Sequence, residues 1–161
     1  MQCAEVMRTD VIIVDPDDMV KVAAIRMRDA NIGFLPVCDG EGKVVGTLTD
    51  RDIAIRVDAE GRSASSCRIG DVMTRETICC RAIDDLARVE DLMAEHKKSR
   101  ILVTDEAGVL EGVVSLSDVA QFEGRRRAAE TIREVTSREA RPLTIPRACR
   151  IRDPDLGGEH G

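Results

Sequence analysis

A short polar motif occurs twice in the sequence, and its residue types could bind a nucleotide. Each copy has the pattern Gly-x-x-Thr/Ser-x-x-Asp. A carboxylate can accept hydrogen bonds from the two hydroxyls of a ribose, and a helix N-terminus with a hydroxyl beside it suits a phosphate. The residues are Gly46, Thr49 and Asp52 in the first copy, and Gly112, Ser115 and Asp118 in the second.

The same spacing also has a purely structural explanation. A hydroxyl followed three residues later by an acid resembles a capping box, which satisfies the free N–H groups of the first turn of a helix. On the ligand-binding interpretation, by contrast, the motif glycine would let a ligand approach the strand backbone. Gene duplication, however, would copy a structural cap as faithfully as a binding site. The residues alone therefore leave helix cap and nucleotide site both open.

The two motifs belong to a longer internal repeat, in which the second copy follows the first at a constant offset along the chain. Sliding the sequence by this offset places Val6 on Val72 and Asp39 on Asp105. The alignment needs no gap, so we expect the two halves to be copies of one supersecondary unit.

Each unit is predicted to run strand, helix, strand, strand, helix. In the first unit, a strand at 11–14 ends at Asp15-Pro16, and a helix capped by Asp17 or Asp18 follows. Strands at 33–37 and 44–48, joined by the Gly-rich turn 39–42, form a hairpin, and the second helix opens at Thr49. The second unit offers strands at 101–103 and 110–114 and a helix opening at Ser115. The apolar stripes of the first helices are Val20, Ala23, Ala24 and Met27 in one unit, and Leu86, Val89 and Met93 in the other.

The predicted fold class is α/β (α+β), because each unit combines three short strands with two helices. One unit is too small to cover both faces of its sheet, so we expect the two to pack across a pseudo-two-fold axis. The expected boundaries are 1–57 for the first domain, 58–70 for a linker, 71–122 for the second domain and 123–161 for an Arg-rich appendage. Within that appendage we expect a charged helix at 125–139 and a disordered tail at 142–161.

Composition excludes several functions. A net charge of −6 argues against a general nucleic-acid binder. No segment has the length and apolar character of a membrane span or signal peptide, so we expect a cytoplasmic protein.

The six cysteines show no C-x-x-C spacing, which argues against structural zinc. We expect Cys79 and Cys80 to be buried thiols, with a vicinal redox switch as the alternative. His96 is the only plausible base before the appendage, so we expect no enzyme activity.

The repeated segments resemble tandem cystathionine-β-synthase (CBS) domains. The resemblance rests on DVMT at 71–74, GFLPV at 33–37 and GTLTDRDI at 46–53, and it covers residues 3 to 122. It implies one globular CBS pair, with clefts between the units for AMP, ADP, ATP, S-adenosylmethionine or a related dinucleotide. The second copy departs from the family pattern, since Leu102 replaces the usual proline.

The resemblance also implies roles for individual residues. Asp52 and Asp118 would hold ribose, while Thr49, Ser115 and Arg100 would contact phosphate. Because Phe34 replaces the basic residue in the other half, we expect the two clefts to be unequal. The residues implied to hold adenine are Ile12, Ile32, Phe34, Ile78 and Ile101.

These observations predict a non-catalytic regulatory module that binds an adenosine-containing ligand and has no tightly bound cofactor. We expect a homodimer, because Val22 and Ile25 add apolar surface beyond one helical stripe. We also expect an unidentified protein partner whose activity the module regulates. The rival hypothesis is an interaction scaffold that dimerises or docks on a partner without binding a nucleotide.

Overall fold

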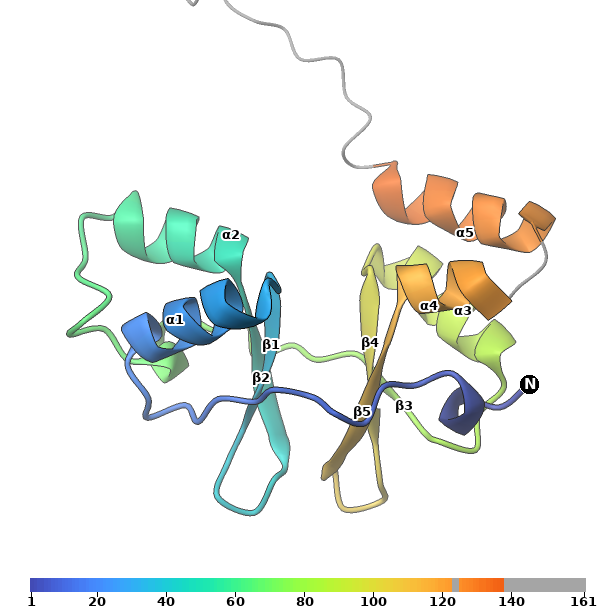
Figure 1. Cartoon of the computed structure of the whole chain (residues 1–161), viewed down its shortest axis with the longest axis horizontal. Coiled ribbons are helices and arrows are strands. Elements are labelled where there is room, and N and C mark those ends of the chain that lie inside the picture. The colour runs from blue at the N-terminus through green and yellow to red at the C-terminus, as the bar shows by residue number, and fades with distance from the viewer. Residues whose placement is uncertain (123–124, 138–161) are drawn as a thin grey trace, which may run out of the picture.

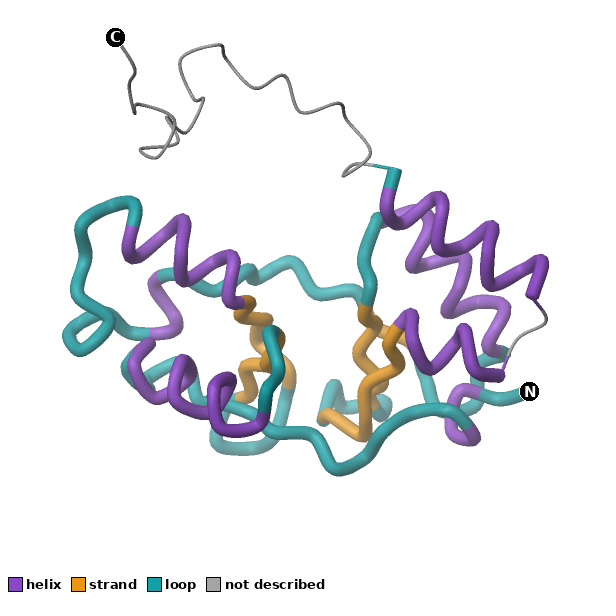
Figure 2. The backbone as a smooth tube through the Cα atoms, turned by 45° about the horizontal axis from the view of Figure 1, so that its top comes forward, coloured by secondary structure: helices purple, strands orange, loops and turns teal. Residues whose placement is uncertain are grey.

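Two similar units lie side by side in the computed structural model, which describes residues 1–122 and 125–137. The strands of both units lie at the centre of the molecule, and the helices lie on the outer sides (Figures 1 and 2). None of the helices in these ranges has the length and apolar character needed to cross a membrane.

The first unit contains two helices and a two-stranded antiparallel sheet. Its elements are α1 (Val20–Ala30), β1 (Phe34–Cys38), β2 (Val44–Thr49) and α2 (Asp50–Ile53), and α2 continues as a π-helical turn at Ala54–Asp58.

The predicted strand at 11–14 is wrong in extent. Only Val14 pairs, in a parallel bridge to Val37 of β1, and Ile12 and Ile13 are exposed. The carbonyl of Ile13 accepts a hydrogen bond from Arg26 instead of joining the sheet. A side chain therefore satisfies the backbone group that a longer strand would have used.

The second unit has the predicted order of strand, helix, strand, strand, helix. Its elements are β3 (Cys79–Cys80), α3 (Leu86–His96), β4 (Arg100–Thr104), β5 (Leu110–Ser115) and α4 (Leu116–Phe122). Strand β3 is parallel to β4, and β4 is antiparallel to β5. The mixed α/β class and the repeated unit predicted from the sequence are both confirmed.

The two hairpins are joined by a symmetric pair of backbone hydrogen bonds. The Val44 N–H donates to the Gly108 carbonyl, and the Leu110 N–H donates to the Gly42 carbonyl, each at 3.0 Å. In the repeat, Val44 is equivalent to Leu110 and Gly42 is equivalent to Gly108, so the two hydrogen bonds are equivalent by symmetry. The two units are therefore related by a pseudo-two-fold axis that passes between the hairpins.

The apolar stripe of the first helix of each unit faces the core, as its spacing predicts. Val20, Ala23 and Met27 are buried on α1, whereas Ala24 is half-buried. On α3, the residues Leu86, Val89 and Met93 are buried.

The predicted side-chain cap of α1 is wrong. Met19 occupies the cap position, and the N–H groups of Val20 and Lys21 donate to the carbonyls of Cys67 and Ala64. Asp18 instead accepts a hydrogen bond from the backbone of Asp15. Backbone carbonyls from a distant segment thus satisfy the first turn of this helix.

Each unit completes its core with a segment that precedes the other unit in the sequence. Cys3 and Val6 pack into the core of the second unit. Cys67, Ile69 and Met73 pack into the core of the first unit. The linker predicted at 58–70 is therefore partly a core element, and the two hydrophobic cores do not follow the predicted domain boundaries.

The two adjacent cysteines differ, which corrects the expectation that both are buried. Cys79 is exposed, whereas Cys80 is buried with its sulfur 3.5 Å from that of Cys3. Neighbouring residues of a strand point to opposite faces, so only Cys80 faces the core. The close thiol pair is therefore Cys3 with Cys80 rather than Cys79 with Cys80.

Helix α5 (Arg125–Thr136) packs against α3 and α4, so it is not a separate appendage. Val135 and Thr131 are buried, and the Thr131 hydroxyl donates to Glu90 on α3 at 3.3 Å. The charged helix predicted at 125–139 is thus present over most of that range. The tail predicted at 142–161 lies outside the described residues.

Candidate ligand-binding cleft

A cleft of about 500 Å³ opens between the two units, within the range of small-molecule sites. Residues of both units line it, so a ligand there would contact both. The lining residues are Gly33, Phe34, Thr47, Thr49, Asp50, Arg51, Asp52, Arg56, Thr74, Glu76, Thr77, Ile78, Lys98, Ser99, Arg100 and Leu102.

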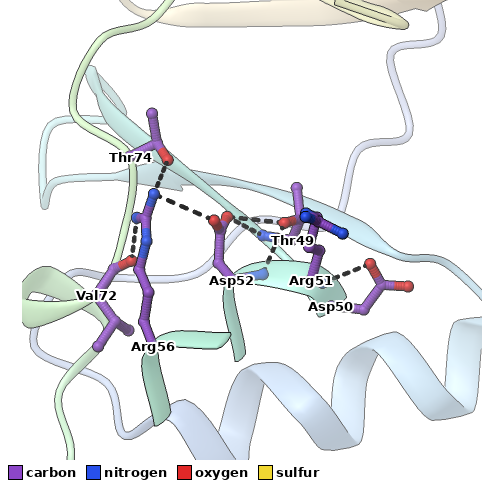
Figure 3. Close-up of polar contacts among 7 residues, drawn as sticks. All are labelled: Thr49, Asp50, Arg51, Asp52, Arg56, Val72 and Thr74. Carbon is purple, nitrogen blue, oxygen red and sulfur yellow. Dashed lines mark hydrogen bonds and ion pairs between the residues drawn. The ribbon is translucent and has the colours of Figure 1, made fainter. Parts of the chain in front are cut away.

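The first motif forms a complete capping box at the start of α2 (Figure 3). The Asp52 N–H donates to the Thr49 hydroxyl at 3.1 Å, and the Thr49 N–H donates to Asp52 Oδ2 at 2.9 Å. The Thr49 hydroxyl donates to the same carboxylate oxygen at 2.8 Å. The helix-cap interpretation is therefore correct for this motif, and the cap holds Asp52 in the cleft wall.

The second carboxylate oxygen of Asp52 faces Arg56, which the sequence analysis missed. Arg56 Nη2 lies 3.4 Å from Asp52 Oδ1 and donates to the Thr74 hydroxyl at 3.2 Å (Figure 3). Its Nη1 donates to the Val72 carbonyl at 2.6 Å. Arg56 thus connects the motif to the segment that leads into the second unit. Residues four apart on a helix lie on the same face, so the spacing of Asp52 and Arg56 could have indicated this ion pair.

Phe34 and Arg100 come from different units but lie together in this one cleft, which corrects the expectation that they distinguish two clefts. The Arg100 guanidinium lies 5.4 Å from the centre of the Phe34 ring, a cation–π distance. The two residues are equivalent under the repeat, so the pseudo-two-fold axis that relates the units brings them together. Ile78 adds an apolar surface to the same cleft.

The cleft has a mixed charge with a small basic excess. Four basic residues line it, against three acidic ones. Such a wall can offer hydrogen-bond donors to phosphate and a carboxylate to ribose. The basic residues are Arg51, Arg56, Lys98 and Arg100, and the acidic residues are Asp50, Asp52 and Glu76.

The second motif forms the same capping box but has a different partner. The Asp118 N–H donates to the Ser115 hydroxyl at 3.2 Å, and the Ser115 N–H and hydroxyl both donate to Asp118 Oδ2. Arg8 binds the other oxygen, with Nε and Nη2 each 3.0 Å from Oδ1. Burial alone would raise the pKa of Asp118, but the hydrogen bonds from Ser115 and Arg8 together hold that pKa below its usual value.

Both motif glycines have a structural reason that does not depend on a ligand. A Cβ at Gly46 would lie 2.7 Å from the Met73 sulfur and 2.9 Å from the Thr74 carbonyl oxygen. A Cβ at Gly112 would lie 2.7 Å from the Arg8 carbonyl oxygen. Each glycine therefore makes room for the segment that precedes a unit.

The aliphatic residues implied by the resemblance are separated in space. Ile78 lines the cleft, whereas Ile101 is fully buried in the core of the second unit and is not accessible to a ligand. Ile12 and Ile32 are exposed, at 39% and 36%, and neither lines this cleft. Core burial of Ile101 follows from strand alternation, because its neighbour Arg100 points to the opposite face.

Comparisons with known proteins agree with this architecture. The CBS domain model matches the chain twice, at residues 3–58 and 69–124. The CBS domain-containing protein YhcV of Bacillus subtilis is 34% identical over 116 residues, which cover 72% of this chain and 81% of that protein.

An enzyme and a ligand-bound structure are also similar. The inosine-5'-monophosphate dehydrogenase of Methanocaldococcus jannaschii is 31% identical over 145 residues, which cover 90% of this chain but only 27% of the enzyme. The CBS domain pair of protein MJ0100, solved in complex with 5-methylthioadenosine and S-adenosyl-L-methionine, superimposes with a TM-score of 0.67 at 25% identity. The superposition covers 75% of this chain and 94% of that one.

The likeness to the dehydrogenase is confined to its CBS part, and CBS-pair proteins are generally regulatory and non-catalytic. The two matched ranges, together with the paired units of the fold, identify the family. This chain belongs to the CBS-domain family, as a tandem CBS pair.

Proposed function

We propose that this protein is a regulatory module that binds an adenosine-containing ligand in the cleft at Asp52. The observation that carries the proposal is the composition of that cleft, where a carboxylate held by a helix cap lies among four basic side chains. Ribose and phosphate need these two kinds of group within one site. The MJ0100 pair, which binds two adenosine compounds, supports this ligand class.

Each part of the ligand has a suitable surface. The Oδ1 atom of Asp52 would accept hydrogen bonds from the ribose hydroxyls, since the cap occupies only Oδ2. The adenine ring would lie against Ile78 and Phe34. Phosphates of AMP, ADP or ATP would contact Arg100 and Lys98, whereas the sulfonium of S-adenosylmethionine would favour the acidic side of the cleft.

The position of the cleft explains how binding would regulate another protein. A ligand that contacts both units stabilises one relative arrangement of them by its differential affinity for that arrangement. Arg56 would link ligand binding to the second unit, because it contacts both Asp52 and the backbone carbonyl of Val72. A ribose that binds Asp52 would compete with Arg56 and alter its hold on the connecting segment.

Thermal denaturation with AMP, ADP, ATP and S-adenosylmethionine, each added separately, tests the proposal. A ligand at one hundred times its Kd adds about 2.7 kcal/mol to the stability of the folded state. For a domain of this size, the melting temperature should rise by roughly 5 to 10 °C. No rise with any of the four would favour the interaction scaffold instead.

We also propose a homodimer as the working form. Helix α5 covers part of α3 and α4, whereas Ile25 on α1 and Ile55 after α2 are exposed at 39% and 46%. An isologous contact through the α1 and α2 faces would bury these side chains. Sedimentation at micromolar concentration should show a species of twice 17.6 kDa, and a species of 17.6 kDa alone would contradict the dimer.

A further inference from the structure

Arg8 and Thr74 occupy equivalent positions, one beside each motif. The repeat that relates the two units places Arg8 on Thr74. The Arg8 backbone exchanges two hydrogen bonds with Val113 on β5, at 2.9 and 3.0 Å. The Thr74 backbone exchanges two with Thr47 on β2, each at 2.9 Å. Both segments are therefore fixed on a strand in the same register, and the units differ here in the side chain that the segment presents.

The side chain at this position decides whether the motif carboxylate is open. The uncharged Thr74 accepts a hydrogen bond from Arg56 at 3.2 Å, and the Asp52 side chain keeps 15% of its surface exposed. Arg8 is long enough to reach Asp118 and places two N–H groups on Oδ1, each at 3.0 Å. The Asp118 side chain is only 6% exposed. Arg8 thus covers Asp118 more closely than Arg56, at 3.4 Å, covers the equivalent carboxylate of Asp52.

The hydrogen-bonding capacity of Asp118 is also used within the protein. Ser115 donates its N–H and its hydroxyl to Oδ2, and Arg8 donates to Oδ1. A ribose would have to displace an ion pair whose carboxylate is almost fully buried. Replacing a short, charge-assisted contact by neutral hydroxyl donors is unfavourable.

We infer that Arg8 determines which of the two duplicated motifs takes a ligand. It closes the Asp118 motif from within the chain, so the CBS pair binds one adenosine ligand, at Asp52. This inference rests on the function proposed for the Asp52 cleft. The N-terminal segment, which runs past β5 in Figure 1, would thereby block the second site, and the backbone bridge of Arg8 to Val113 holds it there.

Isothermal titration calorimetry with AMP, ATP and S-adenosylmethionine, each titrated separately, tests the inference. The variant is Arg8→Thr, which gives the second motif the residue of the first. Arg28→Thr is the matched control, since it removes the same charge from an exposed site on α1 where Arg28 pairs with its neighbour Asp29. Wild type and control should bind one molecule per chain, and Arg8→Thr should bind two. Adding Asp118→Asn to Arg8→Thr should return the stoichiometry to one.

The outcomes separate this inference from the proposed function. Two molecules bound per wild-type chain, or no additional site in a folded Arg8→Thr variant, would overturn the inference while leaving the Asp52 site intact. Loss of a wild-type site in Arg8→Thr would also overturn it, because Arg8 would then be a phosphate ligand. If wild type binds none of the three probes, the proposed function fails. In that case a site gained by Arg8→Thr would still show that Arg8 closes the Asp118 motif, whereas no gained site would overturn the inference as well.

Discussion

Arg8 and Asp118 form an ion pair across 110 residues of sequence, and this pair attaches the N-terminal segment to the second CBS unit. It adds a side-chain contact to the backbone pairing of Arg8 with Val113 and to the burial of Cys3 and Val6. The equivalent residue of the first unit, Asp52, has a more distant basic partner, Arg56 at 3.4 Å. The two copies of the motif thus share a backbone geometry but differ in their electrostatic partners.

Asp118→Asn should destabilise the protein more than Asp52→Asn does. The first change weakens charged hydrogen bonds to an almost buried group and should cost about 1.5 to 3 kcal/mol. The second mainly weakens a helix cap and should cost about 1 kcal/mol or less. Urea unfolding of the two variants without nucleotide measures both values. Equal losses would show that the Arg8 contact adds little.

The contribution of Asp118 should depend on pH. Because the folded state holds the pKa of Asp118 below its ordinary value of 3.8, ionisation of this group stabilises the fold at pH above that value. The stabilisation disappears as the pH falls through the lower folded pKa. The difference in unfolding free energy between wild type and Asp118→Asn should therefore be large at neutral pH and shrink as the pH falls below 3.8. A difference that stays constant with pH would contradict the ion pair.

Asp52→Asn should weaken nucleotide binding without unfolding the protein. Losing the charged acceptor for ribose should cost about 1.5 to 3 kcal/mol, which is roughly a 10- to 150-fold rise in Kd. Asp29→Asn removes the same charge from an exposed position on α1 and should leave Kd unchanged. Calorimetry with the nucleotide that gives the largest melting shift compares the two. Unchanged affinity in Asp52→Asn would show that Asp52 does not bind the ribose.

Gly46→Ala should destabilise the fold, because its new Cβ would lie 2.7 Å from the Met73 sulfur and 2.9 Å from the Thr74 carbonyl oxygen. Overpacking of this kind costs about 1 to 3 kcal/mol. Gly40→Ala is the control, since a Cβ at Gly40 meets no atom within 4 Å. Melting temperatures should fall for the first variant only. A similar loss in both would point to a general effect of replacing glycine.

The described cysteines should differ in their reactivity with a thiol reagent. Cys79 is exposed and should react first in the folded protein, although partial burial raises its pKa and slows the reaction. Cys3 and Cys80 are buried and should react only after unfolding. Mass spectrometry of peptides after timed labelling would assign each site. Early modification of Cys80 would show that β3 opens readily.

Local patterns in the sequence determined the repeated unit and the position of its motif. The constant spacing of the repeat, the apolar stripes of α1 and α3, and the Asp-Gly turn of the first hairpin can each be read along the chain without knowledge of the fold. Periodicity and turn chemistry therefore report them directly. The Thr49 and Asp52 capping box is equally local, since both partners lie within one helical turn. The spacing therefore indicated a cap, although it left a nucleotide site open as the alternative.

Only the tertiary structure decided which groups surround each motif. The pairing of Arg8 with Asp118, the contact of Arg100 with Phe34 and the packing of Ile69 into the first unit join residues that are far apart in sequence. Periodicity cannot report such contacts, because they depend on where the pseudo-two-fold axis lies and on which unit each connecting segment joins. Two equivalent motifs could therefore be recognised from the sequence, but the difference in their surroundings arises from partners that folding brings together.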